Sequence, residues 1–158
     1  MSTDVTAEDS TRPYHVMRRI FEEGFAAGDA SVVDQLCSPG LVEHQFGLAA
    51  TGEQAREHVK AAIRDVHAAV PDISFAIEDS AEQDDKIWVR VRARGTATGP
   101  FLGPPSNKPV DITVFDLARV ADGLIVEHWG VPDRFAMLAQ TGLLGRLAPA
   151  DSHQPAGE

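Results

Sequence analysis

The sequence predicts a single α+β domain in which helices come first and an antiparallel sheet follows. Three observations lead to this prediction. Apolar residues recur every three or four positions over residues 14–27 and 51–70, which is the spacing of amphipathic helices. Apolar and polar residues alternate over residues 73–78 and 86–98, which is the spacing of strands. An Asp-Gly pair at 122–123, between two further alternating runs, is a strong signal for a tight hairpin.

The helices come first along the chain. Residues 14–27 are predicted to form one helix that ends near Gly28. A second, short helix has Asp29 as its candidate N-cap, and a brief extended segment follows at 41–46. The third helix begins after Thr51, which forms a capping-box pattern with Gln54, and ends before Pro71.

Residues 86–98 are predicted to form a long strand with two unlike faces. The apolar face carries Ile87, Val89, Val91 and Ala93. The other face carries Trp88, Arg90, Arg92 and Arg94. This alternation is typical of a strand with one face on a core and the other polar. In the Gly- and Pro-rich loop that follows, Phe101 and Leu102 would either cap a pocket or simply close one end of the sheet.

Composition and length limit the class of protein. The chain has 158 residues, with 24 acidic against 14 basic residues and a net charge of −10. An acidic surface argues against nucleic acid or an anionic membrane as the main partner. No apolar run approaches the roughly 20 residues that cross a bilayer, and the first residues lack the pattern of a secretion signal, so a cytoplasmic protein is expected. One domain is expected over residues 13–145, with flexible tails at 1–12 and 146–158.

The hairpin over residues 111–133 carries acids on a face that should be apolar. A two-residue loop at the Asp-Gly pair would place Ala121 opposite Leu124 and so fix the register of both strands. In that register Asp116, Glu127 and Asp133 share one face with Ile112, Val114, Ala118, Val120, Ile125, Trp129 and Val131. Burial of an unpaired ionised carboxylate is costly, so these acids must be paired, protonated or facing a cavity.

Two interpretations of the three acids remain open. Carboxyl groups that line an apolar cavity can act as general acids or bases, or donate a hydrogen bond to an oxyanion. Alternatively, Asp116 and Glu127 pair with arginines of the neighbouring strand, and Asp133 is the N-cap of a following helix.

Five segments resemble those of a known protein family. They read VEH (42–44), AAVPDISFAIED (68–79), GTATGPFLG (95–103), DLARVADGLIVEHW (116–129) and VPDRFAMLAQTGLL (131–144). They are similar to the SnoaL-like polyketide (ester) cyclases of the nuclear-transport-factor-2-like superfamily. The resemblance implies a cone-shaped barrel, in which a strongly curved mixed or antiparallel sheet wraps around a pocket closed by N-terminal helices. It also implies aldol-type ring closure of a polyketide-like polycyclic carbonyl compound by acid/base catalysis, without metal or cofactor.

The resemblance assigns roles to individual residues. Asp133 matches the general base, Asp116 resembles the oxyanion donor of ketosteroid isomerases, and His44 sits where those isomerases carry their base. The residues expected to bind substrate are Trp129, Glu127, Phe101, Leu102, Tyr14, Phe21, Val114 and Val131. Many relatives have Asp directly after the Trp, where this chain has Gly130, so a base at that position would be missing here.

Other functions and partners follow from the same features. The fold also suits a binding protein for a hydrophobic metabolite, an isomerase, a dehydratase or an epoxide hydrolase. The Glu-His pairs at 43–44, 57–58 and 127–128 lack the spacing of a metal site. A homodimer is expected because the outer face of the hairpin would carry Phe115, Leu117, Val126 and His128.

Overall fold

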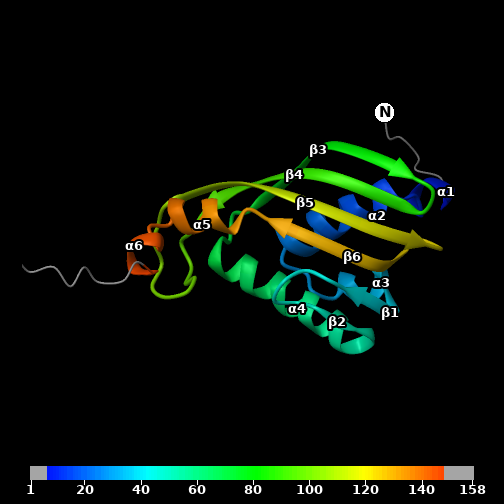
Figure 1. Cartoon of the computed structure of the whole chain (residues 1–158), viewed down its shortest axis with the longest axis horizontal. Helices are drawn as coiled ribbons and strands as arrows, with labels where there is room; N and C mark the ends of the chain where they lie inside the picture. The colour runs from blue at the N-terminus through cyan, green and yellow to red at the C-terminus, as the bar shows by residue number, and fades with distance from the viewer. Residues whose placement is uncertain (1–6, 148–158) are drawn as a thin grey trace, which may run out of the picture.

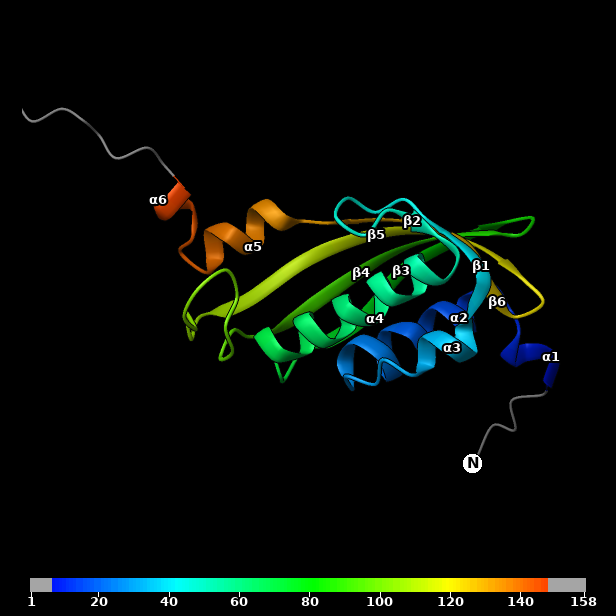
Figure 2. The same cartoon turned by 90° about the horizontal axis from the view of Figure 1, so that it is seen from below.

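The computed structural model describes residues 7–147 as a six-stranded sheet packed on one face against helices (Figures 1 and 2). The outer parts of the tails predicted over 1–12 and 146–158 lie outside the described residues. A short helix, α1 (Ala7–Ser10), lies within the first of those ranges. The mixed α+β architecture with N-terminal helices is the predicted fold class, and the curved sheet is open at both edges.

The helices form where apolar residues recur at helical spacing. The remaining ones are α2 (Pro13–Arg19), the π-helical continuation η1 (Ile20–Ala26), α3 (Val32–Leu36), α4 (Gly52–Ala69), α5 (Arg134–Gln140) and α6 (Leu144–Leu147). Thr51 is the N-cap of α4, as predicted, but its side chain makes no capping hydrogen bond. Ser31, rather than Asp29, is the N-cap of α3, and the Asp29 carboxylate accepts from the Ser31 N–H.

The strands are β1 (Cys37–Glu43), β2 (Ala50–Thr51), β3 (Ser74–Gln83), β4 (Lys86–Thr96), β5 (Pro109–Ala121) and β6 (Leu124–Pro132). They lie in the order β2-β1-β6-β5-β4-β3. The β1–β6 contact is parallel, whereas the other neighbouring strands are antiparallel. The parallel contact brings the first strand of the chain against the last one, so that residues far apart in sequence lie side by side.

The core lies between the sheet and the helices. Figure 2 shows α2, α3 and α4 on one side of the sheet. The predicted inner face of β4 is confirmed, because Ile87, Val89, Val91 and Ala93 are all buried. Trp88 and the three arginines of the same strand lie on the outer face.

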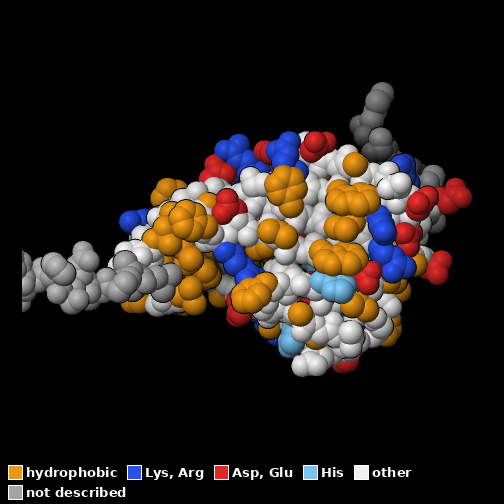
Figure 3. Space-filling model, in the orientation of Figure 1, with side chains coloured by type: hydrophobic (Ala, Val, Ile, Leu, Met, Phe, Trp, Pro, Cys, Tyr) orange, Lys and Arg blue, Asp and Glu red, His pale blue; other side chains and the backbone are white. Residues whose placement is uncertain are grey.

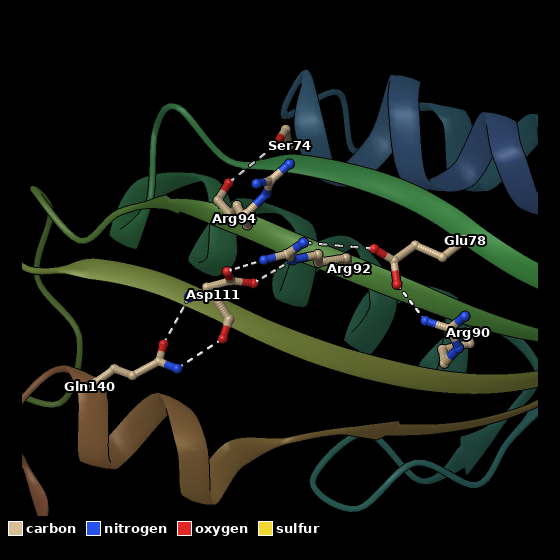
Figure 4. Close-up of polar contacts among 7 residues, drawn as sticks. All are labelled: Ser74, Glu78, Arg90, Arg92, Arg94, Asp111 and Gln140. Carbon is tan, nitrogen blue, oxygen red and sulfur yellow. Dashed lines mark hydrogen bonds and ion pairs between the residues drawn. The ribbon is translucent and has the colours of Figure 1, made fainter.

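The outer face carries a row of ion pairs that engages two of these arginines (Figure 4). Arg90 pairs with Glu78, and Arg92 forms two hydrogen bonds with Asp111, at 2.8 and 2.6 Å. Gln140 of α5 bonds both backbone groups of Asp111, which fastens α5 to β5. The alternative in which Asp116 and Glu127 pair with arginines of this strand is wrong, because Asp116 contacts His128 and Glu127 contacts His44 and Arg119 instead. Exposed ion pairs of this kind contribute little to stability, because water and salt screen the attraction between the charges.

A β-bulge changes the register of the hairpin. Asp122 and Gly123 both have positive φ, of 52° and 75°, as a two-residue turn of type I′ requires, so the predicted hairpin is confirmed. Val120 pairs with Ile125, but Arg119 then pairs with Glu127, which leaves Val126 as an extra residue. A shift of one residue moves every following side chain of the strand to the opposite face. The register predicted beyond Ile125 is therefore wrong.

Candidate active site

The bulge brings three ionisable side chains together on the inner face of the sheet. Asp116 of β5 and Glu43 of β1 are both buried, and His128 of β6 lies between them. His128 Nδ1 is 2.8 Å from Glu43 Oε2, and its Nε2 is 3.1 Å from Asp116 Oδ2. We call Glu43, His128 and Asp116 the buried triad.

The geometry of the triad favours a doubly protonated imidazole. Both ring nitrogens face carboxylate oxygens, and an ionised carboxylate can only accept hydrogen bonds, so both nitrogens must donate. Burial alone would lower the pKa of His128, but the charges and hydrogen bonds of Asp116 and Glu43 raise it to about 10. With both carboxyl groups ionised, the triad carries one net negative charge.

One oxygen of the triad has no protein partner. Asp116 Oδ1 is buried and makes no hydrogen bond to any other residue of the described chain. Glu43 is fully engaged by contrast, because its Oε1 also accepts from the Gln45 N–H at 2.8 Å. Buried polar atoms without partners are uncommon, and they suggest a functional role or an absent ligand. Asp116 Oδ1 is therefore the atom at which we expect chemistry.

Four predicted site residues, His44, Glu127, Trp129 and Val131, lie on the opposite face of the sheet. His44 is exposed and stacks on Trp129, with ring centroids 4.4 Å apart and an interplanar angle of 7°. Glu127 lies 3.4 Å from both His44 Nε2 and Arg119 Nη1. Their predicted placement beside Asp116 is wrong, because the bulge turns Glu127 and Trp129 outward and the parallel β1–β6 pairing places His44 with them.

Asp133 is also separated from the triad. It is exposed, and its Oδ1 accepts a hydrogen bond of 2.9 Å from the Ala136 N–H, which makes it the N-cap of α5. The shared face predicted for Asp133 and Asp116 is wrong for the same reason, while the helix-capping alternative is confirmed. The base role that the resemblance implies for Asp133 therefore receives no support from its position, which is apart from Asp116.

The Asp133→Ala variant should lower the free energy of unfolding by about 1 kcal/mol, because the capping acceptor is lost. Asp133→Asn is the matched control, since Asn caps helix N-termini about as well as Asp. Urea denaturation of both variants measures the difference. Loss of ring-closing activity in Asp133→Asn, with an unchanged free energy of unfolding, would support the base role that the resemblance implies for Asp133.

The other predicted substrate-binding residues are scattered. Phe21 is buried and stacks on Phe75 at 5.5 Å, Tyr14 packs against the core, and Val114 lies buried on the inner face near Asp116. Leu102 is exposed. Phe101 lines a cavity of about 300 Å³ between the 97–108 loop and the segment after α5, and none of the triad residues lines this cavity. Of this group, Val114 alone stands on the same strand face as the triad.

The outer face of the sheet contains an apolar groove. Its cavity has a volume of about 330 Å³, and the side chains along it include Trp88, Phe115, Leu117, Trp129 and Val131. Figure 3 shows hydrophobic side chains gathered over the strands on this face. Phe115 and Val131 are 57% and 67% exposed, so this groove is open to solvent in the single chain.

Sequence reasoning missed Glu43 and Gln45 as neighbours of Asp116, and it placed His128 on the wrong face. It noted Gly130 only as the position where relatives carry Asp. A signal for Glu43 existed, since an acid follows Leu41 at the spacing of a buried strand face. The position of His128 could not be predicted in this way, because no sequence pattern marked Val126 as a bulge.

Among residues 7–147, no group of three His, Cys, Asp or Glu side chains has an arrangement that could hold a metal ion. Within the same range, no helix is long and apolar enough to span a membrane.

Comparisons with known proteins agree with the resemblance noted in the sequence. The family model of SnoaL-like polyketide cyclases matches residues 15–141. IdmH from Streptomyces antibioticus, a candidate polyketide cyclase, is 32% identical with a TM-score of 0.71, over 82% of this chain and 98% of IdmH. TsrD from Streptomyces laurentii is 26% identical with a TM-score of 0.71, over 82% of this chain and 94% of TsrD.

A protein of ketosteroid isomerase-like fold from Catenulispora acidiphila extends the structural comparison. It is 16% identical with a TM-score of 0.65, over 87% of this chain and 99% of that protein, and this likeness concerns the fold alone. A search of curated proteins found no significant match.

Proposed function

This chain belongs to the SnoaL-like polyketide cyclase family, and we propose that it closes a ring of a polyketide-like polycyclic carbonyl compound by an intramolecular aldol reaction. The setting that fits such a reaction is secondary metabolism. One observation carries the proposal: a buried carboxylate, Asp116, is held by His128 through Oδ2 while its Oδ1 is left free.

The free oxygen has the properties of a general base. It would remove a proton from the carbon next to a carbonyl group, and the electron pair of the C–H bond would pass into an enolate. The enolate carbon would then attack a second carbonyl of the same molecule, forming a C–C bond and an alkoxide. Asp116, now protonated, would return the proton to the alkoxide. No atom is lost, and the carboxyl group ends the cycle in its starting state.

The other two members of the triad position Asp116. His128 donates to Asp116 Oδ2, which fixes the plane of the carboxylate and aims Oδ1 away from the imidazole. Glu43 accepts from the opposite nitrogen, at 2.8 Å, and so holds the imidazole between the two acids. A base that is fixed before the substrate arrives needs little rearrangement during proton transfer.

A hydrophobic-metabolite binding protein is the second candidate function. The apolar groove on the outer face favours it, because aromatic and apolar side chains that could hold a flat ring line most of the groove, with Asp79 and Asp116 also among its lining residues. Hydrogen–deuterium exchange separates the two functions. 2-Tetralone, a bicyclic ketone with acidic protons at C1, is incubated with the protein in D₂O and followed by proton NMR. A cyclase should speed the exchange above the buffer rate, whereas a carrier should not.

We further propose that the outer face mediates a homodimer. Phe115 and Leu117 lie on it as predicted, whereas His128 does not, since the bulge turns it inward. Large exposed apolar side chains on one sheet face commonly mark an interface. Light scattering should give twice the 17.0 kDa chain mass, and Phe115→Asp should give the single-chain mass with an unchanged circular dichroism spectrum. A wild-type protein that stays monomeric at micromolar concentrations contradicts this proposal.

A further inference from the structure

The side chain of Gln45 occupies space that strand β6 leaves open. Gly130 is buried and pairs across the sheet with Asp116, so any side chain at position 130 would point to the inner face beside that acid. A Cβ atom built there would overlap Gln45 Oε1 and lie 3.0 Å from Asp116 Oδ1. Gly130 does not have the positive φ that would itself call for glycine. The glycine is therefore explained by the close approach of Gln45.

This arrangement puts a carboxamide next to the free oxygen of the triad. The two groups meet at one point, the position of the missing Cβ of Gly130. A carboxamide has an acceptor oxygen and a donor NH₂ group, which change places when the group rotates by 180°. Gln45 can therefore offer a donor to ionised Asp116 and an acceptor to protonated Asp116. We call the space above Gly130 the Gly130 seat. The carboxamide that fills it belongs to another segment of the chain, so it can leave the seat by rotation of the Gln45 side chain.

Access to Asp116 requires that some group move. Asp116 Oδ1 is fully buried, so a substrate cannot reach it in this conformation. The neighbouring Gly130 and His128 belong to a strand of the sheet, whereas Gln45 lies in the turn between β1 and β2 (Figure 1). The backbone of that turn is anchored, because the Gln45 N–H donates to Glu43 and the Gln45 C=O accepts from Leu48. Rotation of the Gln45 side chain alone would therefore empty the seat.

We propose that Gln45 is a gating residue, whose carboxamide closes the site and is replaced on the Gly130 seat by the reacting carbonyl or enol group of the substrate. This inference rests on the proposed function, because it takes Asp116 Oδ1 as the atom that the substrate must reach. The ligand class comes from the proposed function: the group that replaces the carboxamide beside Asp116 Oδ1 would be an oxygen of a polycyclic carbonyl compound or of its enol.

Binding of 2-naphthol, a planar bicyclic enol analogue, tests the gate by fluorescence titration. Gln45→Ala should bind it about tenfold more tightly, because the apparent dissociation constant of a gated site is its intrinsic constant divided by the open fraction. Gly130→Ala should bind about tenfold more weakly, since the added methyl group fills the seat itself. The double variant should match Gly130→Ala. Gln54→Ala, at an exposed position of α4, is the matched control and should bind as the wild type does.

The outcomes are distinct. Binding by Gln45→Ala within twofold of the wild type would show that the side chain closes nothing, and tenfold weaker binding would show that it holds the ligand instead; either result overturns the gate. Circular dichroism establishes that each variant is folded, and Gln45→Ala alone decides the question if Gly130→Ala is not. Failure of the proposed function would be recognised by a different measurement. The wild-type protein would then not speed the deuterium exchange of 2-tetralone above the buffer rate, and this outcome does not depend on how the variants bind 2-naphthol.

Discussion

The Asp116→Asn variant should exchange the C1 protons of 2-tetralone about 10³-fold more slowly than the wild-type protein, with a native circular dichroism spectrum. A carboxamide has nearly the same shape as a carboxylate but has no useful basicity, so the variant removes the proton acceptor without opening a cavity. Positioned general bases typically contribute rate factors of about 10²–10⁴. The same variant should lose ring closure by a similar factor once a substrate is known.

The matched control for this variant is Asp111→Asn. Asp111 lies on the same strand, but it is exposed on the outer face, where it binds Arg92 (Figure 4). Its replacement should leave the exchange rate unchanged, because Asp111 is remote from the triad. An Asp116→Asn protein that retains exchange within about threefold of the wild type would remove Asp116 from the mechanism and leave the binding function as the better account.

The His128→Gln variant should lower the free energy of unfolding by about 3–5 kcal/mol. Glu43 and Asp116 are buried, and removal of the cation between them leaves two carboxylates facing each other without compensation. Urea denaturation near pH 6.5 measures the loss. His44→Gln is the matched control: it removes an exposed imidazole from the outer face and should cost no more than about 1 kcal/mol.

The stabilisation from His128 should depend on pH in a defined direction. The folded protein holds this proton with a pKa of about 10, above the ordinary value of 6.5. The contribution is therefore fully present below pH 6.5 and is lost as the pH rises from 6.5 towards 10, at up to about 1.4 kcal/mol per pH unit. The stability difference between wild type and His128→Gln should shrink over that interval. A difference that stays constant from pH 6.5 to 10 would show that His128 is neutral in the folded protein.

Local sequence patterns determined most of the elements and several faces. Helical spacing located α2 with η1 and α4, the alternation in β4 separated its buried from its exposed side chains, and the Asp-Gly pair fixed the hairpin turn. The same patterns placed Asp116 on the buried face of β5. These predictions succeed because each depends on residues a few positions apart, whose periodicity follows directly from helix and strand geometry.

The tertiary structure alone decided which residues surround Asp116. The extra residue Val126 moves His128 and Gly130 to the inner face of the sheet, where Asp116 lies. It moves Glu127, Trp129 and Val131 to the outer face. The parallel pairing of β1 with β6 then brings Glu43 to a histidine 85 positions away, and the next turn brings Gln45. A bulge depends on how the whole sheet must twist to cover its helices, and a parallel pairing depends on contacts between distant segments. Because no local pattern records either one, the sequence could identify the acid but not its partners.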